Sequence, residues 1–159
     1  EALRRVTAEV AHIEYRQLIV LDATGGSAVY SGGNVLGVWG EARGQDAAAA
    51  GNLLARHDVP SAILTAFEGA SGHLGDRLLT GLRAGLAAGG EAGPVHSAGL
   101  LLVDRVDWPV ADLRCDWSDD CPIETLGNAW DIYKPQMEDY IRRALDPSLA
   151  PSYGVPGDA

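Results

Sequence analysis

The stretch YRQLIVLDATGGSAVYSG, residues 15–32, decides the fold class of this chain. Its first part, residues 15–24, is rich in the branched and aromatic side chains that favour a β-strand. Gly25 and Gly26 then give the freedom of a tight turn, and residues 27–32 are predicted to form a second strand. The stretch therefore predicts an antiparallel β-hairpin.

The segments around this hairpin predict further elements. An apolar pattern over residues 1–10 indicates a helix, although no Ser, Thr, Asp or Asn precedes it as a cap. The glycine-rich residues 32–44 are predicted to form an irregular loop. Alanines favour a helix over residues 45–55, but Gly51-Asn52 would break one, so we expect a strand sandwiched tightly by small residues.

The chain from residue 58 onward predicts two groups of helices separated by strands. One helix is expected over residues 58–70 and another from Leu74 to Gly89-Gly90, with strands at 96–108 and 109–118. A long helix follows from Asp120 to residue 145, with a kink at Pro135. Hairpin-joined strands with helices between the pairs indicate an α+β layered sandwich and not a doubly wound parallel sheet.

Composition narrows the class of protein. The chain has 159 residues, 47% of them hydrophobic, which predicts one soluble globular domain. A net charge of −10 argues against nucleic acids and anionic membranes as partners. Two cysteines, Cys115 and Cys121, are too few for a disulfide framework and lack the spacing of a zinc site. We expect a protein of the reducing cytoplasm without a bound metal.

The segment VADLRCDW carries the first candidate site residues. On a strand, Asp112, Arg114 and Asp116 would share one face and could orient a polar substrate, with Arg114 holding a carboxylate. The alternative is a solvent-facing strand whose charges pair with one another. A metal cation is disfavoured because an arginine stands between the two carboxylates.

Three polar residues beside glycines are the other candidates. Asn52 follows Gly51 and could donate a hydrogen bond to a developing oxyanion, or it could cap a strand end or fix a bulge. Ser31 enters the glycine-rich loop, which could line a site or form a plain turn. Ser97, in VHSAG, lacks both the first glycine and the following helix of a nucleophile elbow, so catalysis by a Ser97–His96 pair is not expected.

Six blocks of sequence, taken in order, resemble the family catalogued as domain of unknown function 1028. They are YRQLIVLD, YSGGN, AAGNLLA, LGDRLLTGLRAGLAAGGE, HSAGLLLV and ADLRCDWSDDCPIETL. The family is placed with the N-terminal nucleophile (Ntn) hydrolase-like proteins. The resemblance implies a four-layer αββα sandwich with antiparallel sheets, of which residues 1–145 would be the C-terminal portion, its N-terminal strands missing from this chain.

The resemblance also implies a chemistry. An Ntn hydrolase attacks an amide carbonyl with the hydroxyl or thiol of its first residue, and its free α-amino group acts as the base. Glu1 has neither group, so the nucleophile is expected upstream of Glu1 and no catalytic residue is expected in this chain. The residues expected to line the active site are Ser31, Asn52, Ser97, Asp112, Arg114 and Asp116.

These expectations combine into one function and one alternative. The function is hydrolysis of a small amide or a related C–N bond, without a cofactor, and the partners are a small-molecule substrate and the chain's own cleaved N-terminal segment. The alternative is a non-catalytic protein that binds a small ligand or serves assembly. The proline-rich tail, residues 146–159, is expected to be extended and, through Tyr153, could lie across a neighbouring subunit of a homo-oligomer.

Overall fold

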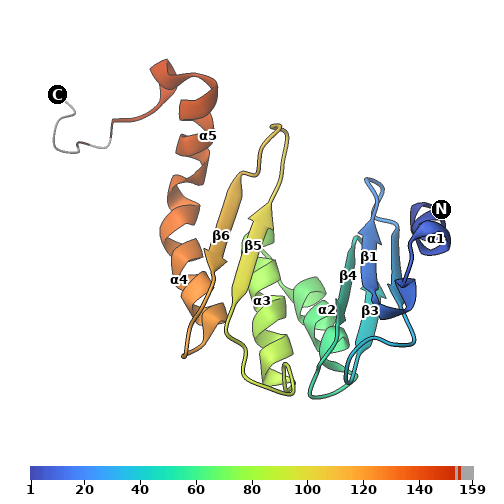
Figure 1. Cartoon of the computed structure of the whole chain (residues 1–159). Coiled ribbons are helices and arrows are strands. Elements are labelled where there is room, and N and C mark those ends of the chain that lie inside the picture. The colour runs from blue at the N-terminus through green and yellow to red at the C-terminus, as the bar shows by residue number, and fades with distance from the viewer. Residues whose placement is uncertain (153, 155–159) are drawn as a thin grey trace. The chain divides into compact units, whose positions relative to one another are not determined.

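The computed structural model describes residues 1–152 and 154 of the chain. It consists of helices and antiparallel sheets, which confirms the predicted α+β class (Figure 1). The chain divides into two compact units, unit 1 over residues 1–95 and unit 2 from residue 96 onward, and each is described by itself. The prediction that residues 1–145 belong to one domain stays a prediction, because two compact units can be parts of the same domain.

The predicted first hairpin is confirmed. Strand β1 (Gln17–Leu21) pairs antiparallel with β2 (Ser27–Ser31), with Gln17 opposite Ser31 at one end and Leu21 opposite Ser27 at the other. The turn is longer than the predicted Gly25-Gly26 pair, because Asp22 organises it. Its Oδ1 accepts hydrogen bonds from the Thr24 hydroxyl at 2.7 Å and from the Thr24 and Gly26 N–H groups at 2.8 and 2.9 Å.

A second hairpin follows, and only half of it was predicted. Strand β4 (Ala47–Gly51) confirms the expected alanine-rich strand. Its partner β3 (Gly40–Gly44) lies in the segment predicted to be a loop, so that prediction was wrong for residues 40–44. The residues of β3 have low strand propensity, but Gly40 lets the strand come close to the backbone of His57. A Cβ on Gly40 would lie 2.2 Å from the backbone oxygen of His57.

Helices cover the hairpins of unit 1. Helix α1 (Ala2–Glu9) and the short turn η1 (Ile13–Tyr15) precede β1, while α2 (Val59–Gly69) and α3 (Leu74–Ala87) follow β4, and all three helices were predicted. Contacts run from α1 to the first hairpin, from there to the second hairpin, then to α2, and from α2 to α3 (Figure 1). The alanines of β4 permit this close packing because they carry no bulk on either face.

Unit 2 is a third hairpin with a helix packed on it. Strand β5 (Ala98–Leu102) pairs antiparallel with β6 (Ala111–Cys115), both shorter than predicted. Helix α4 (Pro122–Tyr133) packs against them through its fully buried Leu126 and Trp130. The Tyr133 hydroxyl donates to the Val110 oxygen at 2.7 Å, and burial raises the pKa of this phenol.

The end of the chain departs from its prediction in one detail. The helix is interrupted where the kink was expected, because Pro135 lies in a 3-10 turn, η2 (Lys134–Gln136), before α5 (Met137–Leu145). The tail was expected to be extended, but Pro147–Leu149 form a further 3-10 turn, η3. The Asp146 carboxylate stabilises it by accepting from the Ser148 N–H at 3.0 Å. Tyr153 lies outside the described residues.

Candidate functional site

A polar cluster joins the two hairpins of unit 1. At the end of the first hairpin, the Gln17 Nε2 atom donates to the Ser31 Oγ at 3.0 Å. The Ser31 hydroxyl donates in turn to the Glu41 Oε2 at 3.1 Å. The same Gln17 nitrogen lies 3.3 Å from the Gly40 oxygen and 3.2 Å from the Gly51 oxygen, which belong to the facing strands β3 and β4.

Two backbone carbonyls fix the orientation of the Gln17 amide. A carbonyl oxygen can only accept a hydrogen bond, so the end of the amide that faces Gly40 and Gly51 must be the NH₂ group. Its two hydrogens serve three acceptors. The Gln17 Oε1 atom is therefore turned away from both carbonyls, and the structure gives it no partner among the described residues.

Asn52 lies next to this cluster because it directly follows Gly51. Its side chain is exposed and makes no hydrogen bond to the described part of the chain. It does not hold the strand end through its amide, which was one alternative for it. The amide is instead open to solvent at a point where the preceding carbonyl is fixed by Gln17.

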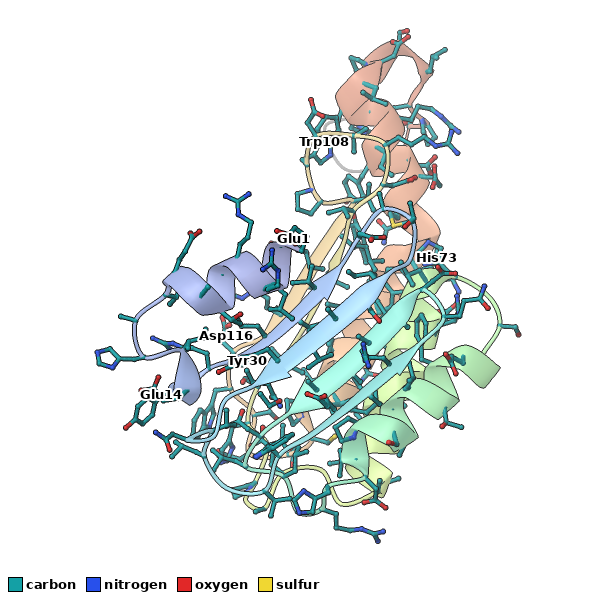
Figure 2. All side chains as sticks on the ribbon, turned by 90° about the vertical axis from the view of Figure 1, so that its right-hand side faces the viewer. Glu1, Glu14, Tyr30, His73, Trp108 and Asp116 are labelled. Carbon is teal, nitrogen blue, oxygen red and sulfur yellow. The ribbon has the colours of Figure 1, made fainter. Side chains whose placement is uncertain are left out.

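The segment entering the glycine-rich loop closes one side of this end of unit 1. The Gly32 N–H donates to the Arg16 oxygen at 3.0 Å, and the Asn34 N–H donates to the Glu14 oxygen at 2.8 Å. A Cβ on Gly32 would lie 2.2 Å from the Glu14 oxygen, so only glycine fits this contact. Glu14 and Tyr30, the neighbour of Ser31, mark this end of the unit in Figure 2.

Two of the three charged candidate residues of unit 2, Arg114 and Asp116, pair with each other. Asp112 and Arg114 share the exposed face of β6, as predicted, and Asp116 follows the strand. The Arg114 Nη2 lies 2.7 Å from the Asp116 Oδ1, with side chains 67% and 76% exposed. This hydrogen bond raises the pKa of the Arg114 guanidinium. An exposed pair of this kind is what the alternative interpretation expected, in which the strand faces solvent and its charges pair. The orienting role of Asp112, Arg114 and Asp116 stays a prediction.

Ser97 lies just before β5, and its side chain is exposed. A strand follows it, as expected, and not the helix of a nucleophile elbow. The ring of its neighbour His96 is engaged elsewhere. Its Nδ1 lies 2.9 Å from the Ser118 oxygen, and the ring stacks on that of Trp117 with centroids 4.0 Å apart. No hydrogen bond between His96 and Ser97 is present.

The structure thus places Ser31 and Asn52 at one end of unit 1, and Ser97, Asp112, Arg114 and Asp116 in unit 2. Sequence reasoning missed Gln17 and Glu41. Gln17 gave one signal, since it is an amide within the predicted strand, directly before the apolar run of residues 18–21. Glu41 gave none, because its strand was predicted to be a loop.

Two kinds of feature are absent from the described residues, 1–152 and 154: a cluster of metal ligands and a membrane-spanning helix. No group of three or more His, Cys, Asp or Glu side chains there could hold a metal ion. Within the same residues, no helix has both the length and the apolar character needed to cross a membrane.

Comparison with protein families identifies the chain. The model of the family of unknown function DUF1028 matches residues 1–126. The chain belongs to this family. The match spans all of unit 1 and continues through the third hairpin into α4, so it includes every candidate residue of both units.

A solved structure supports the assignment. The crystal structure of a Silicibacter pomeroyi protein of the DUF1028 family superposes with a TM-score of 0.79 at 28% sequence identity. The alignment covers 89% of this chain and 63% of that chain, so the present chain corresponds to less than two thirds of its relative. A comparison with curated proteins gives no match.

Proposed function

We propose that this DUF1028 chain forms part of the wall of an active site that hydrolyses a small amide or a related C–N bond. The observation that carries the proposal is the cluster of Gln17, Ser31 and Glu41, with Asn52 beside it. It provides oriented hydrogen-bonding groups at one end of two hairpins that pack on each other. Fixed groups of this kind can position a substrate, and the open Asn52 amide beside them can supply the donors that a developing oxyanion needs.

The packing order of unit 1 supports an Ntn-hydrolase-like fold for the complete domain. Helices lie outside, and two antiparallel hairpins lie between them. We infer that these elements belong to a four-layer αββα sandwich. On this proposal, further strands extend both sheets, and residues 1–145 form its C-terminal portion.

The proposed mechanism assigns no nucleophile to this chain. In an Ntn hydrolase, the hydroxyl or thiol of the first residue attacks the carbonyl, and its α-amino group, with a pKa of about 8, takes the proton. We propose that this residue precedes Glu1 in the complete protein. We assign Ser31 to the positioning of the cluster, because its hydroxyl accepts from Gln17 and donates to Glu41 and so connects the two hairpins.

In this mechanism the Asn52 amide would stabilise the oxyanion, and the cluster of Gln17, Ser31 and Glu41 would position Asn52. The Asn52 amide carries two donors that are open to solvent, so they can meet an oxygen that becomes charged. Gln17 fixes the Gly51 carbonyl immediately before it. The Gln17 Oε1, turned away from both backbone carbonyls, would accept from a substrate N–H.

The proposal is tested on the full-length protein with a panel of small amides, by release of ammonia or amine. We expect turnover of at least one amide and its loss when the first residue of the mature protein is replaced by alanine. Turnover that survives this replacement would overturn the assignment. If no amide turns over but one binds, the protein is the non-catalytic ligand-binding protein that the sequence also allowed.

Assembly is a separate proposal. We expect the full-length protein to form a homo-oligomer, with its cleaved N-terminal segment retained if the chain is processed. Light scattering coupled to size-exclusion chromatography measures the oligomeric state. A denaturing intact-mass spectrum shows whether a cleaved segment is retained. A monomeric mass in solution would contradict the oligomer.

A further inference from the structure

Two adjoining hollows lie at the opposite end of unit 1 from the polar cluster. They open where the β3–β4 turn meets α2 and α3, and their volumes are about 290 and about 620 Å³. Asp46, Phe67 and Leu74 line both. The register of the strands places this end four residues from Gln17 and Gly40, or about 13 Å along the strands. In Figure 2, His73 marks the neighbouring start of α3.

The smaller hollow is almost entirely apolar. It lies between the alanines of β4 and the facing side chains of the two helices. Gly81 forms part of its wall on α3, and Leu21 closes it at the end of β1. Aspartate at position 46 is its one charged lining residue. A hollow of this chemistry accepts a small aliphatic or aromatic group.

The larger hollow is polar, and Arg77 is its cation. The Arg77 guanidinium lies 4.2 Å from the centre of the buried Phe67 ring, and its Nε donates to the Phe67 oxygen at 3.4 Å. These two contacts hold the planar group in place. Its terminal nitrogens have no partner among the described residues, so both remain available to a carboxylate.

Two carboxylates share the hollow with Arg77, and neither forms an ion pair with it. Glu68 is held against the turn, because its Oε1 accepts from the Gln45 N–H at 3.1 Å. Asp46 makes no side-chain hydrogen bond to the described residues, and it lies at the boundary of the two hollows. The polar hollow therefore offers a positive and a negative group at once, beside an apolar hollow.

We propose that these hollows bind a free α-amino acid with an apolar side chain. Its carboxylate meets Arg77, its ammonium group meets Asp46 with support from Glu68, and its side chain enters the apolar hollow. A zwitterion fits better than a simple carboxylic acid, because two carboxylates would repel an anion without an ammonium group. It fits better than a simple amine, which would leave Arg77 without a counterion. This site is distinct from the proposed hydrolytic site.

Calorimetric titration of the purified protein with L-leucine tests the proposal against three analogues. Glycine lacks the apolar side chain, 4-methylpentanoate lacks the ammonium group, and 3-methylbutylamine lacks the carboxylate. We expect L-leucine to bind at least 10-fold more tightly than each. Equal affinity for leucine and either singly charged analogue, or no binding of leucine at millimolar concentration, overturns the proposal.

Two variants assign the charges. Arg77→Met keeps an apolar group over Phe67, and we expect it to weaken leucine binding at least 10-fold while leaving 3-methylbutylamine binding unchanged. Asp46→Asn is expected to weaken leucine binding similarly while leaving 4-methylpentanoate binding no weaker. Arg5→Met is the matched control, because Arg5 is an exposed residue of α1 outside both hollows. Leucine binding that survives both hollow variants, or falls equally in the control, would show that it occurs elsewhere.

Discussion

Gln17 on β1 donates its Nε2 hydrogen bond to the Gly51 oxygen of β4 at 3.2 Å, and so connects the two hairpins of unit 1. The same nitrogen reaches the Gly40 oxygen on β3. One side chain of the first sheet thus holds both strands of the second at their ends. This contact predicts a structural effect that can be separated from any effect on activity.

Replacement of Gln17 by Glu should destabilise the protein. The change puts carboxylate oxygens where two backbone carbonyls need a donor, so the hydrogen bonds are lost and the oxygens repel one another. We expect a loss of about 1–3 kcal/mol in the free energy of unfolding at neutral pH, measured by urea denaturation. Gln136→Glu is the matched control, because that amide meets only the Ile132 oxygen of its own helical turn. Equal losses in the two variants would contradict the role given to Gln17.

Gly40 should tolerate no side chain. A Cβ there would lie 2.2 Å from the His57 backbone oxygen, and backbone cannot move aside as a flexible side chain can. We expect Gly40→Ala to lower the free energy of unfolding by about 1–3 kcal/mol in urea denaturation. Gly33→Ala is the control, since a Cβ on Gly33 meets nothing within 4 Å. A Gly40→Ala protein as stable as this control would show that the two segments separate at little cost.

The two hairpins of unit 1 show which strands the sequence could predict and which it could not. The first hairpin was predictable because its branched and aromatic strand residues and the two glycines of its turn lie within one short segment. Strand β3 was not, because GEARG has little strand propensity and forms a strand only by pairing with the alanines of β4. The small residues of β4 were informative, since they predicted close packing on both faces.

The candidate site was predictable only in part, for a related reason. Ser31 and Asn52 stood out as polar residues beside glycines, and both lie at the end of unit 1 where the cluster forms. Gln17 and Glu41 became visible only when β1 and β3 were brought together, because a contact across two hairpins leaves no periodic signal in the sequence. The tail turn at Pro147–Leu149 was missed because a single side-chain cap, Asp146, determines it.

The Asp22 turn should make stability depend on acid pH. Hydrogen bonds from the Thr24 side chain, the Thr24 N–H and the Gly26 N–H hold the pKa of Asp22 below its ordinary value of 3.8. A carboxyl group with a lowered pKa in the folded state stabilises the protein above its ordinary pKa. That contribution is lost as the pH falls through the folded-state pKa. We expect Asp22→Ala to lower the Tm at pH 7, and the difference from the native protein to shrink below pH 4. A Tm difference that stays constant from pH 7 to pH 2.5 would contradict this account.

The exposed Arg114–Asp116 pair should contribute little to stability. Because both side chains are more than two thirds exposed, water and salt screen their attraction. We expect Arg114→Gln to change the Tm by less than about 1 °C, and its effect on turnover to be the informative measurement. If Arg114 orients a polar substrate, KM rises while kcat changes less. An unchanged KM would leave the pair as surface charge and remove it from the site.

Asn52 should affect turnover without affecting stability. Its amide is exposed and bonds to no described residue, so Asn52→Ala removes no interaction of the folded chain and should leave the Tm within about 1 °C. If the amide stabilises an oxyanion, kcat for the amide substrate of the full-length protein should fall by about 10²–10³. Asn128→Ala is the matched control, because Asn128 is an exposed residue on α4. A kcat for Asn52→Ala equal to that of the control would exclude Asn52 from the reaction. A Tm that falls together with kcat would assign the effect to the strand end and not to the oxyanion.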